Sequence, residues 1–356
     1  MRIVNYKHRI NQIYNPPINK INNNNKNLNK YFPYEKACYF SFGRYAIFNA
    51  LQCIGVIKGD IILVPSLICK DLLSAINSLE AYPVYYDVDK QMMPIINIED
   101  LPISKAIIAV NYFGFPQNLS SLIKYCKKTG SVLIEDNAHG FLSRDENGII
   151  LGSRASLGIF SIRKTIPLIN GAALIINDKK YIKESYVKSH FKRYRSINYY
   201  CKEILRKCFP FIQIRGIRMF IYIGRIFKKI RIGNFISKPD LKSEINLPNQ
   251  KLPTSNLLDQ INAINIHEEI SRRRELYLWI NNLIIELDVK PVFNYLPKNC
   301  VPYTFPFFSS DKKAKKIEKI FNSYGMEIFK WPNLPDQIKD SAPEFYRSIW
   351  CVSFLW

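Results

Sequence analysis

The segment Val132-Leu-Ile-Glu-Asp-Asn-Ala-His-Gly140 decides the fold. Its first residues are apolar, which is typical of a strand buried on both faces of a parallel sheet. Two carboxylates, Glu135 and Asp136, follow at the carboxyl end of this strand. In open α/β sheets, ligands bind at that end of the strands. A buried carboxylate is costly there unless a cation pairs with it, so we expect either a positively charged partner or a role in capping the next helix.

Apolar segments on both sides of this strand alternate with helical patterns. Strands are predicted at 61–65, 84–88, 106–112, 131–135, 157–161 and 172–176, and helices at 44–56, 71–79 and 119–128. Strands that alternate with helices form a mostly parallel sheet with helices on both faces. The predicted fold class is therefore α/β, and we assign this large domain to residues 37–250.

The C-terminal residues, 251–356, have a different pattern. A long helix is predicted at 256–285, followed by strands and a second helix at 289–293, 302–308, 311–324 and 326–329. This order indicates a smaller α+β domain. At the other end, residues 1–36 contain Pro16-Pro17 and a run of asparagines, so we expect an N-terminal extension that forms a mobile arm.

Residues 196–236 form a basic and aromatic insertion in the predicted large domain. The charges of its central stretch, 199–232, recur every few residues, so this stretch cannot span a bilayer. Two interpretations remain open. The stretch lies in a membrane interface, or it is a helical insertion that packs on its own domain or on a partner subunit.

Composition excludes several classes of protein. The chain has 356 residues and a net charge of +22, which favours anionic partners. It has no helix-turn-helix, zinc-finger or RNA-binding signature, so no nucleic-acid partner is predicted. None of the eight cysteines forms a Cys-x-x-Cys pair and only four histidines occur, so neither a metal site nor a disulfide framework is expected. No leader peptide and no apolar run of about 18 residues are recognised, so we expect a cytoplasmic protein.

Two further segments contain residues that could bind a ligand or take part in catalysis. Ser41-Phe-Gly-Arg-Tyr-Ala46 is a glycine turn that opens a helix, and backbone N–H groups at a helix N-terminus bind phosphate. Ile159-Phe-Ser-Ile-Arg-Lys-Thr165 places Lys164 after a short strand, 28 residues beyond Asp136. Each pattern alone has an ordinary structural explanation, but together they combine a phosphate turn, a buried acid and a lysine.

In this combination the chain resembles the DegT/StrS-type sugar aminotransferases, which are pyridoxal-phosphate enzymes of the aspartate aminotransferase fold (fold type I). The resemblance covers residues 41–178 and resumes from residue 255 to the C-terminus. Further matching stretches are Gly59-Asp-Ile-Ile-Leu-Val-Pro-Ser66, Asn111-Tyr-Phe-Gly-Phe-Pro116 and Arg272-Arg-Arg-Glu-Leu-Tyr277.

The resemblance implies a role for each matching residue. Lys164 would bind the cofactor, pyridoxal 5′-phosphate, covalently, and Asp136 would pair with the cofactor's pyridine nitrogen. His139 would lie near its phenolic oxygen, as a third catalytic residue, and Ala138 against one face of its ring. The donors to the cofactor phosphate would come from Gly43, Arg44, Tyr45 and Ser161.

The chain departs from the family pattern at several positions. Cys69 stands where an aromatic residue often stacks on the cofactor, and we expect it to be a small packing residue rather than a nucleophile. Asn111 stands where histidine is common, and Ala172 replaces a glycine. The asparagine that reaches the phosphate of the partner subunit is not recognisable, although Asn234 is a candidate.

The resemblance therefore implies an aminotransferase. It would move an amino group from an amino acid, expected to be glutamate, to a keto sugar linked to a nucleotide. It also implies a homodimer and a place in the synthesis of surface polysaccharide or lipopolysaccharide. The alternative is a catalytically altered member that acts at a membrane surface or as a partner in glycan assembly, which the stretch 199–232 suggests.

Overall fold

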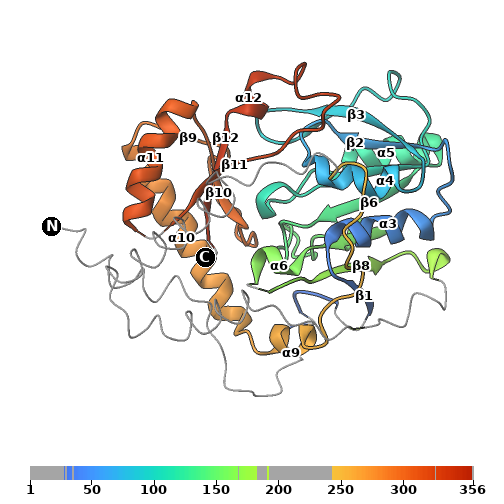
Figure 1. The fold of residues 1–356 in the computed structure, drawn as a ribbon, viewed down its shortest axis with the longest axis horizontal. Helices are drawn as coiled ribbons and strands as arrows, with labels where there is room; N and C mark the ends of the chain where they lie inside the picture. The colour runs from blue at the N-terminus through green and yellow to red at the C-terminus, as the bar shows by residue number, and fades with distance from the viewer. Residues whose placement is uncertain are drawn as a thin grey trace.

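The described residues form two sheets with the helices around them. A large sheet of eight strands and a small sheet of four strands lie side by side (Figure 1). The α/β fold predicted from the sequence is confirmed. The predicted insertion at 196–236, with the stretch 199–232 and the candidate Asn234, lies outside the described residues. The computed structural model describes residues 28, 30–33, 36–166, 168–182, 191, 243–324 and 326–354.

The large sheet has the strand order β1-β8-β7-β6-β5-β2-β3-β4. The five strands from β7 to β3 are parallel, whereas β8 pairs antiparallel with β7 and with β1, and β4 pairs antiparallel with β3. Every residue of β5 is buried, as expected for a strand covered on both faces. The bounds in chain order are Ala37–Phe40, Ile61–Pro65, Tyr82–Val88, Pro94–Ile95, Ala106–Val110, Val132–Asn137, Leu157–Phe160 and Ala172–Ile176 for β1 to β8.

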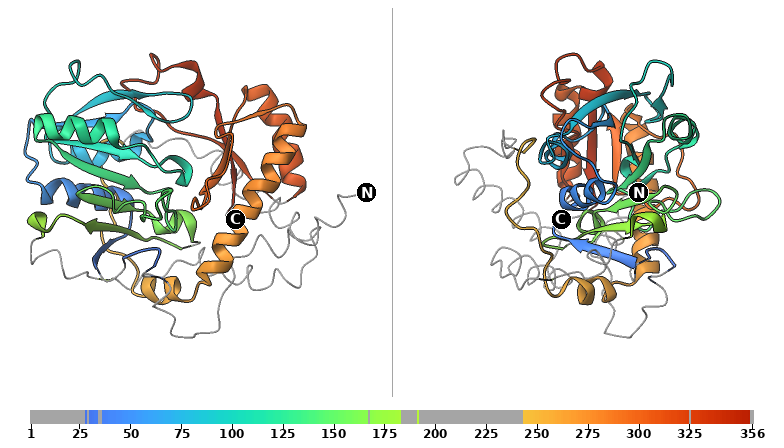
Figure 2. Two further views of the ribbon diagram at one scale, coloured as in Figure 1. Left: turned by 180° about the vertical axis from the view of Figure 1, so that it is seen from behind. Right: turned by 90° about the vertical axis from the view of Figure 1, so that its right-hand side faces the viewer.

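Helices cover both faces of this sheet. The right-hand view of Figure 2 shows α3 (Gly43–Cys53, blue) and α5 (Ser120–Thr129, green) on opposite sides of it. Ala46, Ile47 and Ala50 of α3 are buried, which is the spacing of one helix face. Shorter elements follow the strands at their carboxyl ends, namely η2 (Lys70–Leu72), α4 (Leu73–Asn77), η3 (Tyr112–Gly114), α6 (Ile162–Thr165) and η4 (Lys179–Tyr181).

The small sheet is antiparallel in the order β11-β12-β10-β9. The prediction of a single helix at 256–285 is wrong, because two helices form there, α9 (Leu257–Asn262) and α10 (Ile266–Glu286). The break occurs at Asn265, whose side chain accepts a hydrogen bond from the N–H of Glu268 and starts α10 anew. The other elements are β9 (Lys290–Pro291), β10 (Thr304–Phe308), α11 (Asp311–Ser323), β11 (Ile328–Lys330), α12 (Glu344–Arg347) and β12 (Ile349–Ser353).

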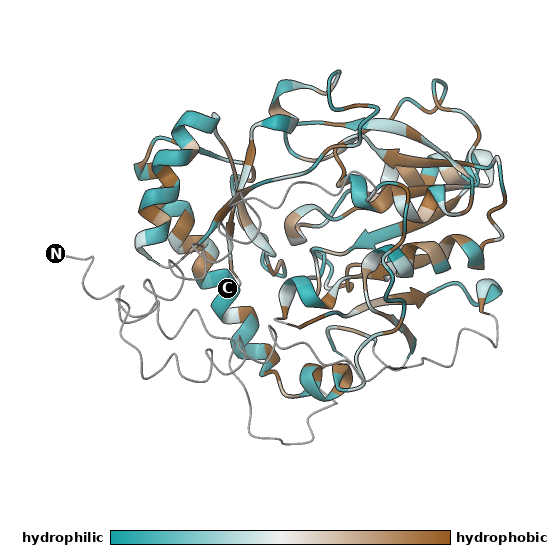
Figure 3. Ribbon diagram, viewed as in Figure 1, coloured by the Kyte–Doolittle hydropathy of each residue, from teal (hydrophilic) through white to brown (hydrophobic). Residues whose placement is uncertain are grey.

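The outer helix α11 shows how the small sheet is covered. Ala314, Ile317 and Phe321 are its buried residues, and they recur at helical spacing along a helix otherwise rich in lysine. In Figure 3 this helix accordingly changes between teal and brown along its length. Among the helices of the described residues, none has the length and apolar character needed to cross a membrane.

The last residues of the predicted N-terminal extension pack on the large sheet. Leu28 and Phe32 are buried in the second hydrophobic cluster. The Phe32 ring lies 5.0 Å from that of Phe160 and 5.4 Å from that of Phe141, in edge-to-face contacts. The expectation of a mobile arm is therefore wrong for residues 28 and 30–33, because an aromatic side chain in this segment fills a cluster beneath the sheet.

Phe32→Ala tests this attachment. Because Phe32 is fully buried, we expect its truncation to lower the free energy of unfolding by about 3–5 kcal/mol. Tyr295→Ala is the matched control, since Tyr295 is 67% exposed and such a change shifts stability by about 0.5 kcal/mol or less. Equal effects of the two changes in urea unfolding would show that the segment is not packed.

Candidate functional site

A cavity of about 160 Å³ lies at the carboxyl ends of β2, β5, β6 and β7. The strand order reverses between β2 and β5, and ligands of open α/β sheets bind at such a switch point. This volume has room for far more than a single water molecule. The cavity is lined by Phe42, Gly43, Arg44, Ile47, Leu67, Ile68, Cys69, Asp71, Leu72, Val110, Tyr112, Asp136, Ala138, His139, Ile159, Ser161, Arg163, Lys164 and Trp331.

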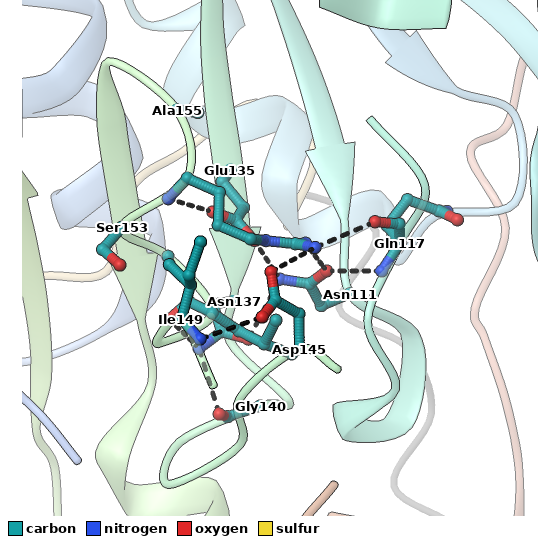
Figure 4. A network of polar contacts seen from close by, with 12 residues as sticks. Asn111, Gln117, Glu135, Asn137, Gly140, Asp145, Ile149, Ser153 and Ala155 are labelled. Carbon is teal, nitrogen blue, oxygen red and sulfur yellow. Dashed lines mark hydrogen bonds and ion pairs between the residues drawn. The ribbon is translucent and has the colours of Figure 1, made fainter. Parts of the chain in front are cut away.

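The two carboxylates at the end of β6 have different roles because successive side chains of a strand point to opposite faces. Asp136 faces the cavity and accepts a hydrogen bond of 3.0 Å from the N–H of Ala138. Glu135 belongs to a polar network on the other face, shown in Figure 4. The sequence places both residues at the end of this strand and gives a role in the site to Asp136 alone, and the structure places Glu135 away from the cavity.

Arg154 neutralises the fully buried Glu135. Its Nε and Nη2 donate to Oε1 of Glu135 at 2.8 and 2.6 Å, and its backbone N–H donates to Oε2 at 3.0 Å. Asn111 Nδ2 donates to the same Oε1 at 2.8 Å (Figure 4). Asn111, a departure from the family pattern, thus ties β5 to β6 in this network, and its backbone N–H donates to the carbonyl of Asp136.

Lys164 lies on α6 in the wall of the cavity. Burial lowers the pKa of its amine, and the charge of Asp136 opposes that effect. Burial likewise raises the pKa of the Asp136 carboxyl, and the charge of Lys164 opposes the rise. The predicted acid and lysine are therefore brought into one cavity, where each stabilises the charged form of the other.

Helix α10, which packs on the small sheet, fixes the segment that follows Lys164. Arg273 of this helix is fully buried and pairs with Glu269 through Nε at 2.7 Å. Its Nη2 donates to the carbonyl of Thr165, and its Nη1 donates to the carbonyl of Tyr303 at 3.0 Å. The Lys164 Nζ lies 5.8 Å from the centre of the Tyr303 ring. One guanidinium thus bonds the backbone beside the lysine and the backbone of Tyr303, the residue whose ring lies near the lysine.

His139 is held as a neutral imidazole. Its Nδ1 accepts the N–H of Phe113 at 3.2 Å, and its ring stacks on Tyr303 at 4.7 Å between centres. Burial, with the charge of Lys164 added, lowers its pKa well below the ordinary range. Phe113 has φ 56°, a left-handed conformation that is costly for an aromatic residue. This conformation presents the N–H to His139 and the carbonyl to Tyr303.

The phosphate turn is formed by the start of α3. Phe42 precedes this helix with no side-chain cap, so the first N–H groups, those of Gly43 and Arg44, have no acceptor within the helix. Ser161 lies close by, because a Cβ added at Gly43 would lie 3.9 Å from its Cβ. Tyr45 is not among the residues that line the cavity. Its N–H donates to the Phe42 carbonyl, and its hydroxyl to the Pro248 carbonyl.

Ala138 and Cys69 both line the cavity, as the sequence predicted. Burial raises the pKa of the Cys69 thiol, with nearby Asp71 adding to the rise. A thiol in this state is a poor nucleophile, which agrees with the interpretation of Cys69 as a packing residue.

Sequence reasoning missed several residues of the site. Arg163 and Asp71 line the cavity, and Trp331 reaches it from the segment before α12. Tyr303 lies beside both Lys164 and His139. Arg163 could have been predicted as a site residue because it directly precedes Lys164 in the sequence. Trp331 and Tyr303 come from distant segments whose local pattern indicates only strands and loops.

Comparison with protein families decides the classification. A model of the DegT/DnrJ/EryC1/StrS aminotransferase family matches residues 12–203, which is more than half of the chain. The chain belongs to this family. Its members depend on pyridoxal phosphate.

Two curated relatives match over part of their length. GDP-perosamine synthase of Escherichia coli O157:H7 is 30% identical over 145 residues, which are 39% of this chain and 40% of that protein. The dTDP-4-dehydro-2,3,6-trideoxy-D-glucose 4-aminotransferase of Saccharopolyspora spinosa is 28% identical over 142 residues, or 38% of this chain and 36% of that protein. The match therefore spans well under half of either relative.

A solved structure supports the fold over the whole length. A DegT DnrJ EryC1 StrS aminotransferase from Brucella abortus superposes with a TM-score of 0.59 at 16% identity. The superposition covers 99% of this chain and 91% of that chain. At this identity the likeness shows the aminotransferase fold alone.

The residues of the cavity fit the family cofactor. Asp136 is a buried acid in need of a cation, and a protonated pyridine nitrogen is one. Lys164 offers an amine whose pKa burial lowers, as covalent attachment to a carbonyl requires. The uncapped start of α3 offers N–H donors to a phosphate.

The buried His139 predicts a pH dependence of stability. Its folded pKa is depressed below the unfolded value, so below about pH 6.5 the unfolded state binds more protons. We expect the wild type to lose about 1.4 kcal/mol more than His139→Gln between pH 7.5 and 5.5. Urea unfolding of the protein without cofactor measures this difference. His267→Gln removes an exposed histidine as control. Identical losses in wild type and His139→Gln would contradict the buried neutral imidazole.

Proposed function

We propose that this chain is a pyridoxal-phosphate-dependent aminotransferase that moves an amino group from an amino acid to a keto sugar linked to a nucleotide. The observation that carries the proposal is that Asp136 and Lys164 both line one cavity at the switch point of the sheet, where the charge of each acts on the pKa of the other. Each of these groups is costly to bury alone, and amino-group transfer by this cofactor needs both.

When bound, pyridoxal phosphate supplies an electron-withdrawing ring that stabilises negative charge on the substrate carbon. The role of Asp136 is to keep a negative charge beside the ring nitrogen, which favours its protonated form. The role of Lys164 is to attach the cofactor and, once released, to carry a proton to and from the substrate carbon through Nζ. Burial suits Lys164 to this task, because it lowers the pKa of the amine toward the working pH.

The remaining side chains orient the reacting groups and exclude water. His139 has Nδ1 engaged by Phe113, so its Nε2–H is the group available to donate a hydrogen bond. Tyr303 and Trp331 pack against His139, with ring centres 4.7 and 5.6 Å away. This aromatic wall lowers the local dielectric, which strengthens the attraction between Asp136 and the charges around it.

The substrate class rests on the relatives and on charge. The names of the two curated relatives specify GDP-linked and dTDP-linked sugars. A net charge of +22 favours an anionic substrate such as a nucleoside diphosphate. Glutamate as the amino donor, a homodimer and a cytoplasmic place in surface polysaccharide synthesis are parts of the same proposal and rest on the family resemblance.

Absorption spectra with added pyridoxal phosphate test the proposal. We expect the wild type to develop a visible band that Lys164→Ala lacks, because the band requires the amine. The Lys124→Ala variant, which removes an exposed lysine of α5, should keep it. Asp136→Asn should retain the band but lose at least about a hundredfold in transamination rate, since the ring nitrogen loses its charged partner.

Addition of amino acids separates the outcomes. A Lys164-dependent band that glutamate bleaches supports an aminotransferase with that donor. A band that persists with every amino acid would contradict the transfer reaction. A band that survives in Lys164→Ala would contradict the role given to this lysine.

A further inference from the structure

Two arginines, Arg44 and Arg163, line the cavity, and their guanidinium groups have no role in the chemistry described above. Arg44 is the second residue of α3, and Arg163 directly precedes Lys164. Both residues line the same small cavity as Ser161. Two cations at one wall of a cavity repel one another unless an anion is bound between them.

The position of Arg163 is fixed by its contact with the start of α3. Its guanidinium carbon lies 5.1 Å from the centre of the Phe42 ring, and Phe42 is the residue that precedes the helix. Ser161, two residues before Arg163, lies against Gly43. The guanidinium of Arg163 is thereby brought to the N-terminal end of α3, where N–H groups are uncapped.

Arg163 also has an unused donor. Its Nε atom is buried, and within the part of the chain that the structure describes it has no hydrogen-bond acceptor. A buried donor without an acceptor costs about 1–3 kcal/mol. Burial lowers the pKa of Arg163, and the positive charge of Arg44 adds to this effect.

The carboxylates that line the cavity do not neutralise both arginines. Asp71 is paired only loosely with Arg44, at 3.8 Å, and its side chain is 45% exposed. Asp136 is matched to Lys164. The described lining of the cavity thus has three cations, Arg44, Arg163 and Lys164, and two carboxylates, Asp71 and Asp136. One positive charge is left at the wall formed by the arginines.

We propose that the guanidinium groups of Arg44 and Arg163 both bind the phosphate group of the cofactor beside the start of α3. The proposal rests on the proposed function, since it assigns the anion in the same cavity. A phosphate monoester carries about −1.5 to −2 charges near pH 7, which the unbalanced positive charge and the uncapped N–H groups of α3 would stabilise together, and arginine binds phosphate oxygens in a bidentate manner.

The test compares pyridoxal phosphate with pyridoxal, which has the same ring and aldehyde but no phosphate. Each compound is titrated into the full chain, and its dissociation constant is read from absorption. The variants are Arg44→Gln, Arg163→Gln and the charge-conserving Arg163→Lys. Arg347→Gln is the matched control, because Arg347 is exposed and outside the cavity.

We expect each glutamine variant to reduce the preference for pyridoxal phosphate over pyridoxal about tenfold or more. The affinity for pyridoxal should stay within about twofold, and Arg163→Lys should be intermediate. An unchanged preference in both glutamine variants would overturn the proposal. If their preference is unchanged while the affinity for glutamate falls, the arginines bind the donor carboxylate instead and the proposal is wrong.

A second measurement separates this proposal from the proposed function. Inorganic phosphate is added without cofactor, and the midpoint of thermal unfolding is followed. We expect phosphate to raise the midpoint of the wild type and of Arg347→Gln, and to do so less in Arg44→Gln and Arg163→Gln. If the wild type forms no band with either aldehyde, the proposed function fails, and this phosphate response alone decides whether the arginine site exists. An equal response in all four proteins would overturn it.

Discussion

The burial of the Asp136 carboxylate is the constraint on which the rest of the structure depends. An acid at the end of a buried strand is costly without a cation nearby. Lys164 on α6 lines the same cavity, and its charge opposes the rise in the pKa of Asp136 that burial causes. The lysine in turn has its pKa lowered by burial, which prepares the amine for covalent chemistry. The elements around the pair serve to keep these two groups in one cavity.

Support for this pair comes from three directions. Behind β6, Arg154 neutralises Glu135, so the strand that presents Asp136 holds a second buried acid without an unpaired charge. From the small sheet side, Arg273 of α10 holds the backbone beside Lys164. From the end of β5, the left-handed Phe113 fixes His139. The cavity therefore depends on residues from both sheets and their helices, not on strand β6 alone.

Local patterns predicted much of the large sheet. The bounds of β2 and β8 agree with the predicted ranges 61–65 and 172–176. The edge strand β1 and the strand β12 were missed, because their pairing with β8 and with β10 and β11 is long-range. Chain order and family resemblance placed Asp136, His139 and Lys164 in one site. They did not place Tyr303 or Arg273, because those contacts exist only after the two sheets pack together.

The measurement that tests the central claim most directly is the location of the covalent link between cofactor and protein. The full chain is incubated with pyridoxal phosphate, the adduct is reduced with borohydride, and the labelled lysine is identified by peptide mass spectrometry. The account predicts label on Lys164, and its loss when glutamate is added before reduction. Label confined to another lysine, such as the buried Lys70, or spread evenly over exposed lysines, would contradict it.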